Sequence, residues 1–182
     1  MIRFATAQDL FEAFPTAAQD VDAEPNDQPS LRYLQDLAEG DEPKRAVAFC
    51  AYLLPRREAV WWGCRSVRRL MPSQSAAELR LMQAAESWIE VPEEEQRIAA
   101  LELGTNSNPN WASTWLALAA GWSGGNMVLG VQTPSPAPPQ QTARAVRAAV
   151  LTAASRVAPQ ERVESLRACI EDGGRIAREE KR

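Results

Sequence analysis

The candidate nucleophiles in this 182-residue sequence are three cysteines, and the sequence contains no histidine to activate them. Without an imidazole base, Ser-His-Asp and Cys-His catalysis and histidine zinc sites are excluded. Cys64 lies beside arginines that could lower its thiol pKa, as in a reactive cysteine. It also lies on the apolar face of a helical pattern, so we expect a packing role. Cys50 and Cys169 are far from it in sequence, and this odd, dispersed set argues against a disulfide framework and against clustered metal ligands.

Carboxylates form the second chemical candidate. The stretch from Glu86 to Glu102 holds six glutamates against one arginine, and paired carboxylates could in principle act as a general acid and base. The run from Glu93 to Glu95 follows Pro92 and is better explained as a helix start, where the macrodipole favours negative charge. The glycine-rich segment GWSGGN lacks the Lys-Ser/Thr of a phosphate-binding P-loop. We therefore predict no catalytic residue, no metal ligand and no cofactor.

The most distinctive stretch, PRREAVWWGCRSVRRLM from Pro55 to Met71, combines five arginines with two adjacent tryptophans. Arginine and tryptophan are enriched at protein-protein hot spots, and arginine pairs well with carboxylates. An internal salt-bridge network to the acidic stretch from Glu86 to Glu102 is an equal alternative. The glycine- and proline-rich loop after Trp122 is a second candidate contact region. The predicted partner-binding residues are Arg57, Trp61, Trp62, Arg65, Arg69, Trp122 and Asn126.

The element that must position these side chains is a helix. Pro55 suits a first helical turn, and Pro72 marks the end because the residue before a proline avoids helical angles. At about 100° per residue, one face of this helix is apolar and is expected to face the core. Trp61 lies in a mixed aromatic and basic stripe on one flank, whereas Trp62 and Arg69 are expected to point away from the core. The residues of the core face are Val60, Cys64, Val67 and Met71.

Helix signals also divide the rest of the chain. Thr6 with Asp9 and Ser75 with Glu78 match the spacing of a capping box. The segment 46–54 is apolar on nearly every side, which predicts a helix at the centre of the fold. A second tryptophan-rich helix is predicted after Asn108-Pro109, with its indoles lining one seam of the core. Its seam residues are Trp111, Trp115, Leu118 and Trp122.

These patterns predict an all-α fold of about eight helices, packed as an irregular or orthogonal bundle in a single domain over residues 1–182. We expect an acidic surface loop at 16–29, a glycine- and proline-rich loop at 123–139, and a frayed tail at 175–182 after Gly173-Gly174. The one short strand pattern, MVLGVQT, has no obvious partner strand. No apolar run approaches the roughly 20 residues of a membrane span.

Composition narrows the function further. Hydrophobic residues make up 45% and charged residues 24% of the chain, as in an ordinary globular domain. The net charge of -4 leaves nucleic-acid binding without its usual electrostatic footprint. The first residues, MIRFATAQDLFEAF, lack the features of a signal peptide, so a cytoplasmic location is expected.

Four segments carry a resemblance to a known family: PRREAVWWGC, ESWIEVPEEEQRIAAL, TWLALAAGWSGGNM and QQTARAVRAAVLTAA. Together, over roughly residues 45–178, they resemble an uncharacterised bacterial family of helical domains associated with type VI secretion gene clusters. The resemblance carries over no catalytic residue. It implies an accessory role, such as an adaptor or chaperone that holds another secretion component before loading.

The sequence thus predicts a non-catalytic cytosolic protein-interaction module whose partner is another protein, with no nucleic acid and an oligomeric state left open. One alternative is a small enzyme that uses carboxylates or Cys64. A third is a regulator that binds a small molecule in a pocket lined by tryptophans.

Overall fold

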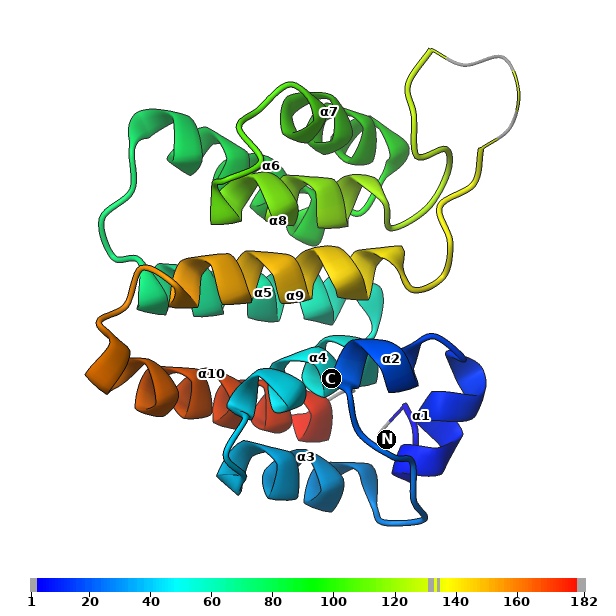
Figure 1. Cartoon of the computed structure of the whole chain (residues 1–182). Helices are drawn as coiled ribbons and strands as arrows, with labels where there is room; N and C mark the ends of the chain where they lie inside the picture. Colours follow the sequence, from blue (N-terminus) through cyan, green and yellow to red (C-terminus); the bar gives the residue numbers. More distant parts are fainter. Residues whose placement is uncertain (1–2, 131–132, 134, 180–182) are drawn as a thin grey trace.

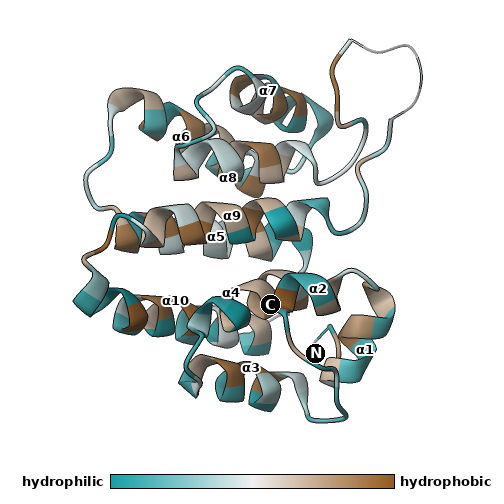
Figure 2. Cartoon of the chain, viewed as in Figure 1, coloured by the Kyte–Doolittle hydropathy of each residue, from teal (hydrophilic) through white to brown (hydrophobic). Residues whose placement is uncertain are grey.

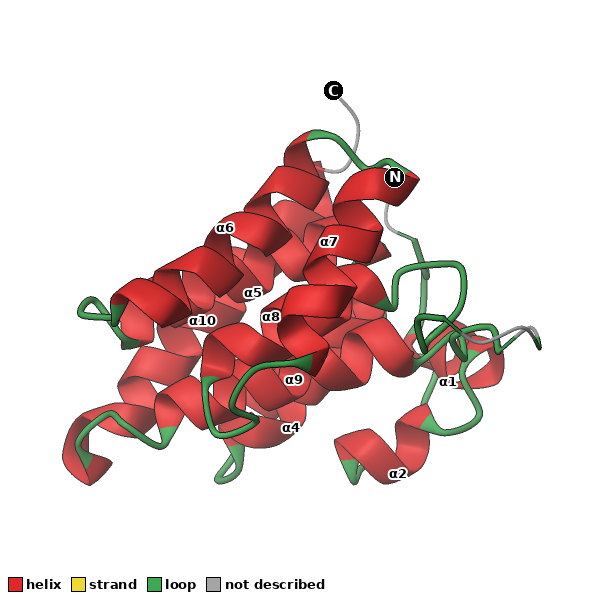
Figure 3. Cartoon of the chain, turned by 90° about the horizontal axis from the view of Figure 1, so that it is seen from above, coloured by secondary structure: helices red, strands yellow, loops and turns green. Residues whose placement is uncertain are grey.

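The structure, a computed structural model, describes residues 3–130, 133 and 135–179. Within them the chain forms ten α-helices and no β-strand, which confirms the predicted all-α fold. Figure 3 shows helices joined by loops and turns in this part of the chain. The helices are α1 (Ala7–Ala13), α2 (Ala17–Val21), α3 (Ser30–Glu39), α4 (Pro43–Leu53), α5 (Arg56–Leu70), α6 (Ala76–Glu90), α7 (Glu94–Thr105), α8 (Ala112–Gly121), α9 (Gln141–Ala154) and α10 (Pro159–Glu179). No helix in the described part of the chain is both long and apolar enough to cross a membrane.

The helices are stacked in tiers (Figure 1). α6, α7 and α8 form one end, α5 and α9 lie in the middle, and α4, α10 and α3 follow beneath them. α9 packs against α8, α5 and α4, and α10 packs against α4, α5 and α3. Every residue from Ala46 to Leu54 is buried, which confirms the predicted central position of this apolar segment.

The helix starts follow the sequence signals closely. The Thr6 hydroxyl accepts from the Asp9 amide, and the Ser75 hydroxyl accepts from the Glu78 amide, so both predicted capping boxes are present. Each box satisfies amide groups that a helix leaves without intrahelical partners. Pro159 is the first residue of α10, a position that suits a proline because its missing N–H leaves no helical bond unmade. These local sequence signals lie at the first residues of α1, α6 and α10 and involve only residues close in the sequence.

Two predicted surface segments are more ordered than expected. The acidic segment 16–29 contains α2, whose Ala17 and Val21 are fully buried against the core. Asp22 ends α2 in a left-handed conformation with φ 56°. The helix is short, so its apolar residues gave no readable periodicity. It is one reason why the described residues contain ten helices rather than about eight.

The predicted fraying from residue 175 is wrong as far as Glu179, where α10 ends; residues 180–182 lie outside the described part. Gly173 and Gly174 are buried, and Ile176 and Ala177 beyond them are buried too. A Cβ atom at Gly173 would overlap the Cys50 sulfur and lie 2.9 Å from Trp62 Nε1. The glycine therefore lets α10 approach α4 and α5 closely, and this packing holds the helix end in place.

The tryptophans of the second tryptophan-rich segment occupy the rim of the core. Trp111 is the N-cap residue of α8, and its indole, like those of Trp115 and Trp122, is half-buried. The fully buried positions of α8 are small or aliphatic, and Figure 2 shows almost no hydrophilic residue on this helix. α8 is enclosed by α6, α7 and α9, so small and aliphatic side chains fill the space between these helices. Trp115 and Trp122 pack against the core, as the predicted seam requires, but these indoles lie at its rim and are half-buried.

The described part of the segment 123–139 contains no helix, as predicted. The described residues of the MVLGVQT pattern, 127–130 and 133, form no strand, and Val131 and Gln132 lie outside the described residues. One isolated antiparallel bridge, between Asn126 and Pro136, flanks this stretch. Arg97 is 5% exposed and donates from Nη1 to the Gly121 carbonyl at 2.6 Å. A second, longer contact of 3.5 Å joins the same atom to the Asn126 carbonyl. A buried guanidinium on α7 thus fixes the start of this loop.

Candidate functional site

The predicted interaction helix is α5, which contacts α6 on one side and α10 on the other. Four of its exposed side chains recur at every fourth residue and form one ridge along the helix. We call this ridge, together with Arg68 and the adjoining Arg175 of α10, the arginine-tryptophan surface. The ridge residues are Arg57, Trp61, Arg65 and Arg69.

Trp61 is the aromatic centre of this surface and is 40% exposed. The Arg65 guanidinium carbon lies 5.4 Å from the centroid of its ring, within the range of a cation-π contact. The Asp172 carboxylate of α10 accepts from Arg65 Nε at 2.6 Å and from Arg65 Nη2 at 3.0 Å. The guanidinium is therefore held in a fixed orientation beside the indole.

Asp172 is nearly buried, with 5% of its surface exposed, and it also accepts from Arg175 Nη2 at 2.6 Å. Burial acts to raise the pKa of its carboxyl, but the hydrogen bond from Arg65 and the charges of Arg65, Arg175 and Arg69 outweigh burial. The net effect lowers the pKa of Asp172 below its ordinary value. The carboxylate therefore stays charged and organises the guanidinium groups around it.

The arginines of α5 differ in whether they form hydrogen bonds or ion pairs with other residues of the protein. Arg68 forms a bidentate pair with Glu86 of α6, with contacts of 2.8 and 2.9 Å. Arg57 Nε donates to the Ile89 carbonyl at 2.6 Å. Arg69 forms no hydrogen bond or ion pair with any other described residue. The alternative of a salt bridge to the acidic stretch from Glu86 to Glu102 thus holds for Arg68, whereas Arg65 pairs with Asp172 outside that stretch. Trp61 and Arg69 remain available at the surface.

Trp62 was expected to point away from the core, and this prediction is wrong. The side chain is fully buried, and its indole N–H donates to the Cys169 carbonyl of α10 at 2.8 Å. α10 covers this side of α5, so a face that one helix alone would leave in solvent becomes part of the core. Trp62 is inaccessible to a partner in this structure, so it is not part of the candidate surface.

Trp122 and Asn126 hold their own loop together. The Trp122 indole donates to the Met127 carbonyl at 3.3 Å, and the Asn126 side chain accepts from the Ser135 amide at 2.8 Å. The loop reaches α5 through Arg56, which donates to the Ser123 carbonyl at 2.6 Å. Because Arg56 and Arg69 are about 20 Å apart along the helix axis, this contact does not bring the loop to the far end of the ridge.

The candidate catalytic groups are poorly placed for chemistry. Cys64 is 2% exposed, and burial is the main cause that raises the pKa of its thiol well above the ordinary value. Its core position is the one that the sequence predicted. Glu86 is engaged by Arg68. Across the described ranges, no three Cys, Asp or Glu side chains are grouped closely enough to hold a metal ion.

The comparison with protein families matched one described as a family of unknown function, DUF6931, over residues 33–177. The chain belongs to the DUF6931 family. No curated protein and no solved structure matched. The DUF6931 match covers α4 to α9 entirely and most of α10, so it contains every residue of the arginine-tryptophan surface. Its description names no activity, partner or secretion system.

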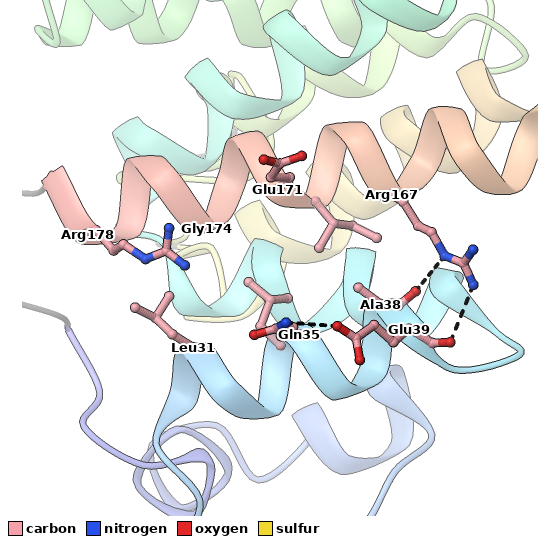
Figure 4. Close-up of a pocket in the computed structure, with 10 residues that line it drawn as sticks. Leu31, Gln35, Ala38, Glu39, Arg167, Glu171, Gly174 and Arg178 are labelled. Carbon is pink, nitrogen blue, oxygen red and sulfur yellow. Dashed lines mark hydrogen bonds between the residues drawn. The ribbon is translucent and has the colours of Figure 1, made fainter.

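One feature of this DUF6931 chain was missed by sequence reasoning. A groove of about 400 Å³ lies between α3 and α10 (Figure 4), and its apolar floor comes from segments about 130 residues apart in the sequence. The helical spacing of Leu31, Leu34 and Ala38 indicates an apolar face, but it gives no sign of the element that packs there. The groove lies on a different face of α10 from the Asp172 cluster, toward α3.

Proposed function

We propose that this protein is a non-catalytic interaction module whose arginine-tryptophan surface binds an acidic segment of a partner protein. The observation that carries this proposal is Trp61, a 40% exposed indole beside Arg65. At the end of the same ridge, Arg69 forms no hydrogen bond or ion pair with another described residue. A large aromatic side chain on a protein surface is unfavourable because its apolar ring stays in contact with water. Such side chains are typical of binding sites when arginines flank them.

The chemistry of the partner follows from the charges. Five arginines line the surface, against two acids that face them, Glu86 and Asp172. A partner segment with aspartate or glutamate would supply carboxylates that match the planar guanidinium groups, and an apolar side chain would cover Trp61. Asp172 holds Arg65 in place before binding, which lowers the entropy lost in the complex.

The two alternatives have less support. An enzyme that uses Cys64 needs a thiolate, and the burial of this side chain opposes ionisation. A tryptophan-lined regulator needs a cavity with indole rings in its wall, and none of the pockets described in the structure has a tryptophan in its lining. The groove between α3 and α10 contains no tryptophan.

The proposal extends to an adaptor or chaperone-like role in the cytoplasm, as an accessory protein of a bacterial type VI secretion system. This part rests on the resemblance of the four sequence segments alone. In such a role the arginine-tryptophan surface would hold an acidic region of another component until that component is transferred.

The test is affinity capture from a lysate of the source cells with three baits. The first is the unchanged protein, the second carries Trp61→Ala with Arg69→Glu, and the third carries Leu79→Ala with Arg80→Glu. The third is a matched control, since Leu79 is 39% exposed and lies beside an arginine on α6. Arg65 is left unchanged because Arg65→Glu would place a carboxylate beside the buried Asp172.

We expect one acidic protein in stoichiometric amount with the first and third baits and its loss from the second. Binding should also weaken at high salt, because pairs of exposed charges are screened. Retention of the same partner by the Trp61→Ala, Arg69→Glu bait, with circular dichroism showing an intact fold, would contradict the proposal.

A further inference from the structure

We propose that the groove between α3 and α10 is a small-molecule site that binds an apolar carboxylate, with the apolar part on the groove floor and the carboxylate on Arg178. This inference is independent of the proposed protein-binding function. Its arguments are the shape of the groove, its apolar floor and the distribution of charge at its edges.

The floor is apolar and comes from two helices. Leu31, Leu34 and Ala38 of α3 face Ile170 and Gly174 of α10 across the groove. A Cβ atom built at Gly174 would meet only Leu34 Cδ2, at an ordinary contact distance of 3.8 Å. The glycine therefore leaves a hollow between the helices. The volume of about 400 Å³ is that of a small-ligand site, which typically measures about 300–1,000 Å³.

Arg167 closes one end of the groove. It reaches from α10 to the C-terminal end of α3, where its Nε donates to the Ala38 carbonyl at 2.9 Å. Its Nη2 lies 3.4 Å from the Glu39 carbonyl (Figure 4). This guanidinium caps carbonyl groups that the end of α3 leaves open, so it serves the fold. It also blocks the passage of a ligand beyond this point.

Arg178 provides the positive charge at the other end. Figure 4 shows its guanidinium between α10 and α3, close to Leu31. It forms no hydrogen bond or ion pair with another residue of the described part. An arginine that faces an apolar groove without a partner fits a carboxylate with two parallel hydrogen bonds. A neutral or cationic ligand would not supply the negative charge that pairs with the Arg178 guanidinium.

Two acidic residues, Glu39 and Glu171, also line the groove. The Glu39 carboxylate accepts from Gln35 Nε2 at 2.8 Å, along the exposed side of α3. Figure 4 shows the Glu171 carboxylate on the side of α10 away from α3. Within the described residues Glu39 and Arg167 are thus engaged by groups of α3, whereas Arg178 is the guanidinium of the groove that has no hydrogen bond or ion pair.

The length of the groove suggests the shape of the ligand. Arg167 and Arg178 are separated by eleven residues on α10, about 16 Å along the axis. A medium-length alkyl chain that ends in a carboxylate fits within such a distance when extended. Decanoate is therefore a suitable probe, used below its micelle-forming concentration.

The experiment is a titration of the whole protein with decanoate, followed by methyl NMR of its leucine and isoleucine residues. Decanol is the matched ligand without charge. Arg178→Gln removes the carboxylate partner, Gly174→Leu fills the hollow, and Arg80→Gln is the control for loss of an exposed arginine elsewhere. Thermal unfolding of each variant checks that the fold is intact.

We expect saturable shifts of the Leu31, Leu34 and Ile170 methyl signals with decanoate. Affinity should fall by about tenfold or more in Arg178→Gln, because a charged hydrogen-bond pair is lost, and should be unchanged in Arg80→Gln. Gly174→Leu should abolish the shifts, and decanol should bind more weakly than decanoate. Absence of saturable shifts, equal binding of decanol, or unchanged affinity in Arg178→Gln would each overturn the inference. Partner capture by Arg178→Gln should match that of the unchanged protein, which separates this site from the arginine-tryptophan surface.

Discussion

Trp61 and Trp62 are neighbours in the sequence with opposite environments. Trp61 is 40% exposed beside Arg65, whereas Trp62 is fully buried against α10 and donates a hydrogen bond to Cys169. A 100° step around α5 moves one indole from solvent into the core. The two positions therefore separate a contribution to binding from a contribution to stability.

We predict that Trp62→Ala lowers the free energy of unfolding by about 3–5 kcal/mol, because it leaves a large cavity and an unpaired Cys169 carbonyl. Trp61→Ala should lower it by less than about 1 kcal/mol, since only an exposed cation-π contact is lost. Urea unfolding followed by circular dichroism measures both values. Similar costs for the two variants would show that the indoles are not placed as described.

Asp172 gives a pH-dependent prediction. Its pKa is lowered in the folded protein, so its charged form stabilises the fold at pH values above its unfolded pKa. This contribution is lost as the pH falls through the folded pKa, below about pH 4. Asp172→Asn should cost about 2 kcal/mol at neutral pH, because Arg65 and Arg175 lose a charged acceptor. The difference between the two proteins should shrink at about pH 3.

Urea unfolding of both proteins at neutral and acidic pH tests this. A stability difference that stays constant from neutral to acidic pH would show that the Asp172 charge is not responsible.

Some residue positions were readable from the sequence and others were not. The apolar face of α5 was correct for Val60, Cys64 and Val67, which are all buried. Trp62 was misplaced because the helical pattern does not show which faces the neighbouring helices cover, and α5 contacts α6, α8, α9 and α10. Asp172 was missed because it is 107 residues from Arg65, and no local pattern marks such a pair.

At the scale of elements, α10 depends on two adjacent glycines with different roles. Gly173 allows the close approach to Cys50 and Trp62, whereas Gly174 faces the groove beside α3. Sequence reasoning treated the pair as a weak point in the helix, because glycine lowers helix propensity. Tertiary packing overrides that propensity, and the helix continues to Glu179.

We predict that Gly173→Ala destabilises the protein by about 1–3 kcal/mol, because the new methyl group overlaps buried atoms. Gly174→Ala should instead stabilise it by about 0.5–1 kcal/mol, because the methyl group fits and helix propensity improves. Thermal unfolding of the two variants, side by side, measures both signs. The same sign at both positions would contradict the packing described for α10.

Helices that begin with a sequence signal of a few residues were predicted well. Elements whose burial depends on contacts with distant parts of the chain were not. The capping boxes of α1 and α6 were identified because their partners are three residues apart. α2 was missed because five residues carry too little periodicity, and its burial comes from packing against α4. The groove between α3 and α10 was missed because its two sides are far apart in the sequence, as Arg65 and Asp172 are.

At the scale of the whole molecule, α10 links the two proposed sites. One side of it supplies Asp172 and Arg175 to the arginine-tryptophan surface, and the side toward α3 supplies Ile170 and Gly174 to the groove. Because both sites use a helix that packs against α3, α4 and α5, each is built on the rigid part of the fold. The family match to DUF6931 extends over most of this helix.

The central claim is that the arginine-tryptophan surface is where a partner protein docks. Its most direct test is photo-crosslinking in the source cells, with p-benzoylphenylalanine in place of Trp61 in one protein and in place of Arg80 in another. We predict a crosslinked species from position 61 alone, with mass spectrometry placing the crosslink in an acidic segment of a different protein. No crosslink from position 61, or the same species from both positions, would contradict the account.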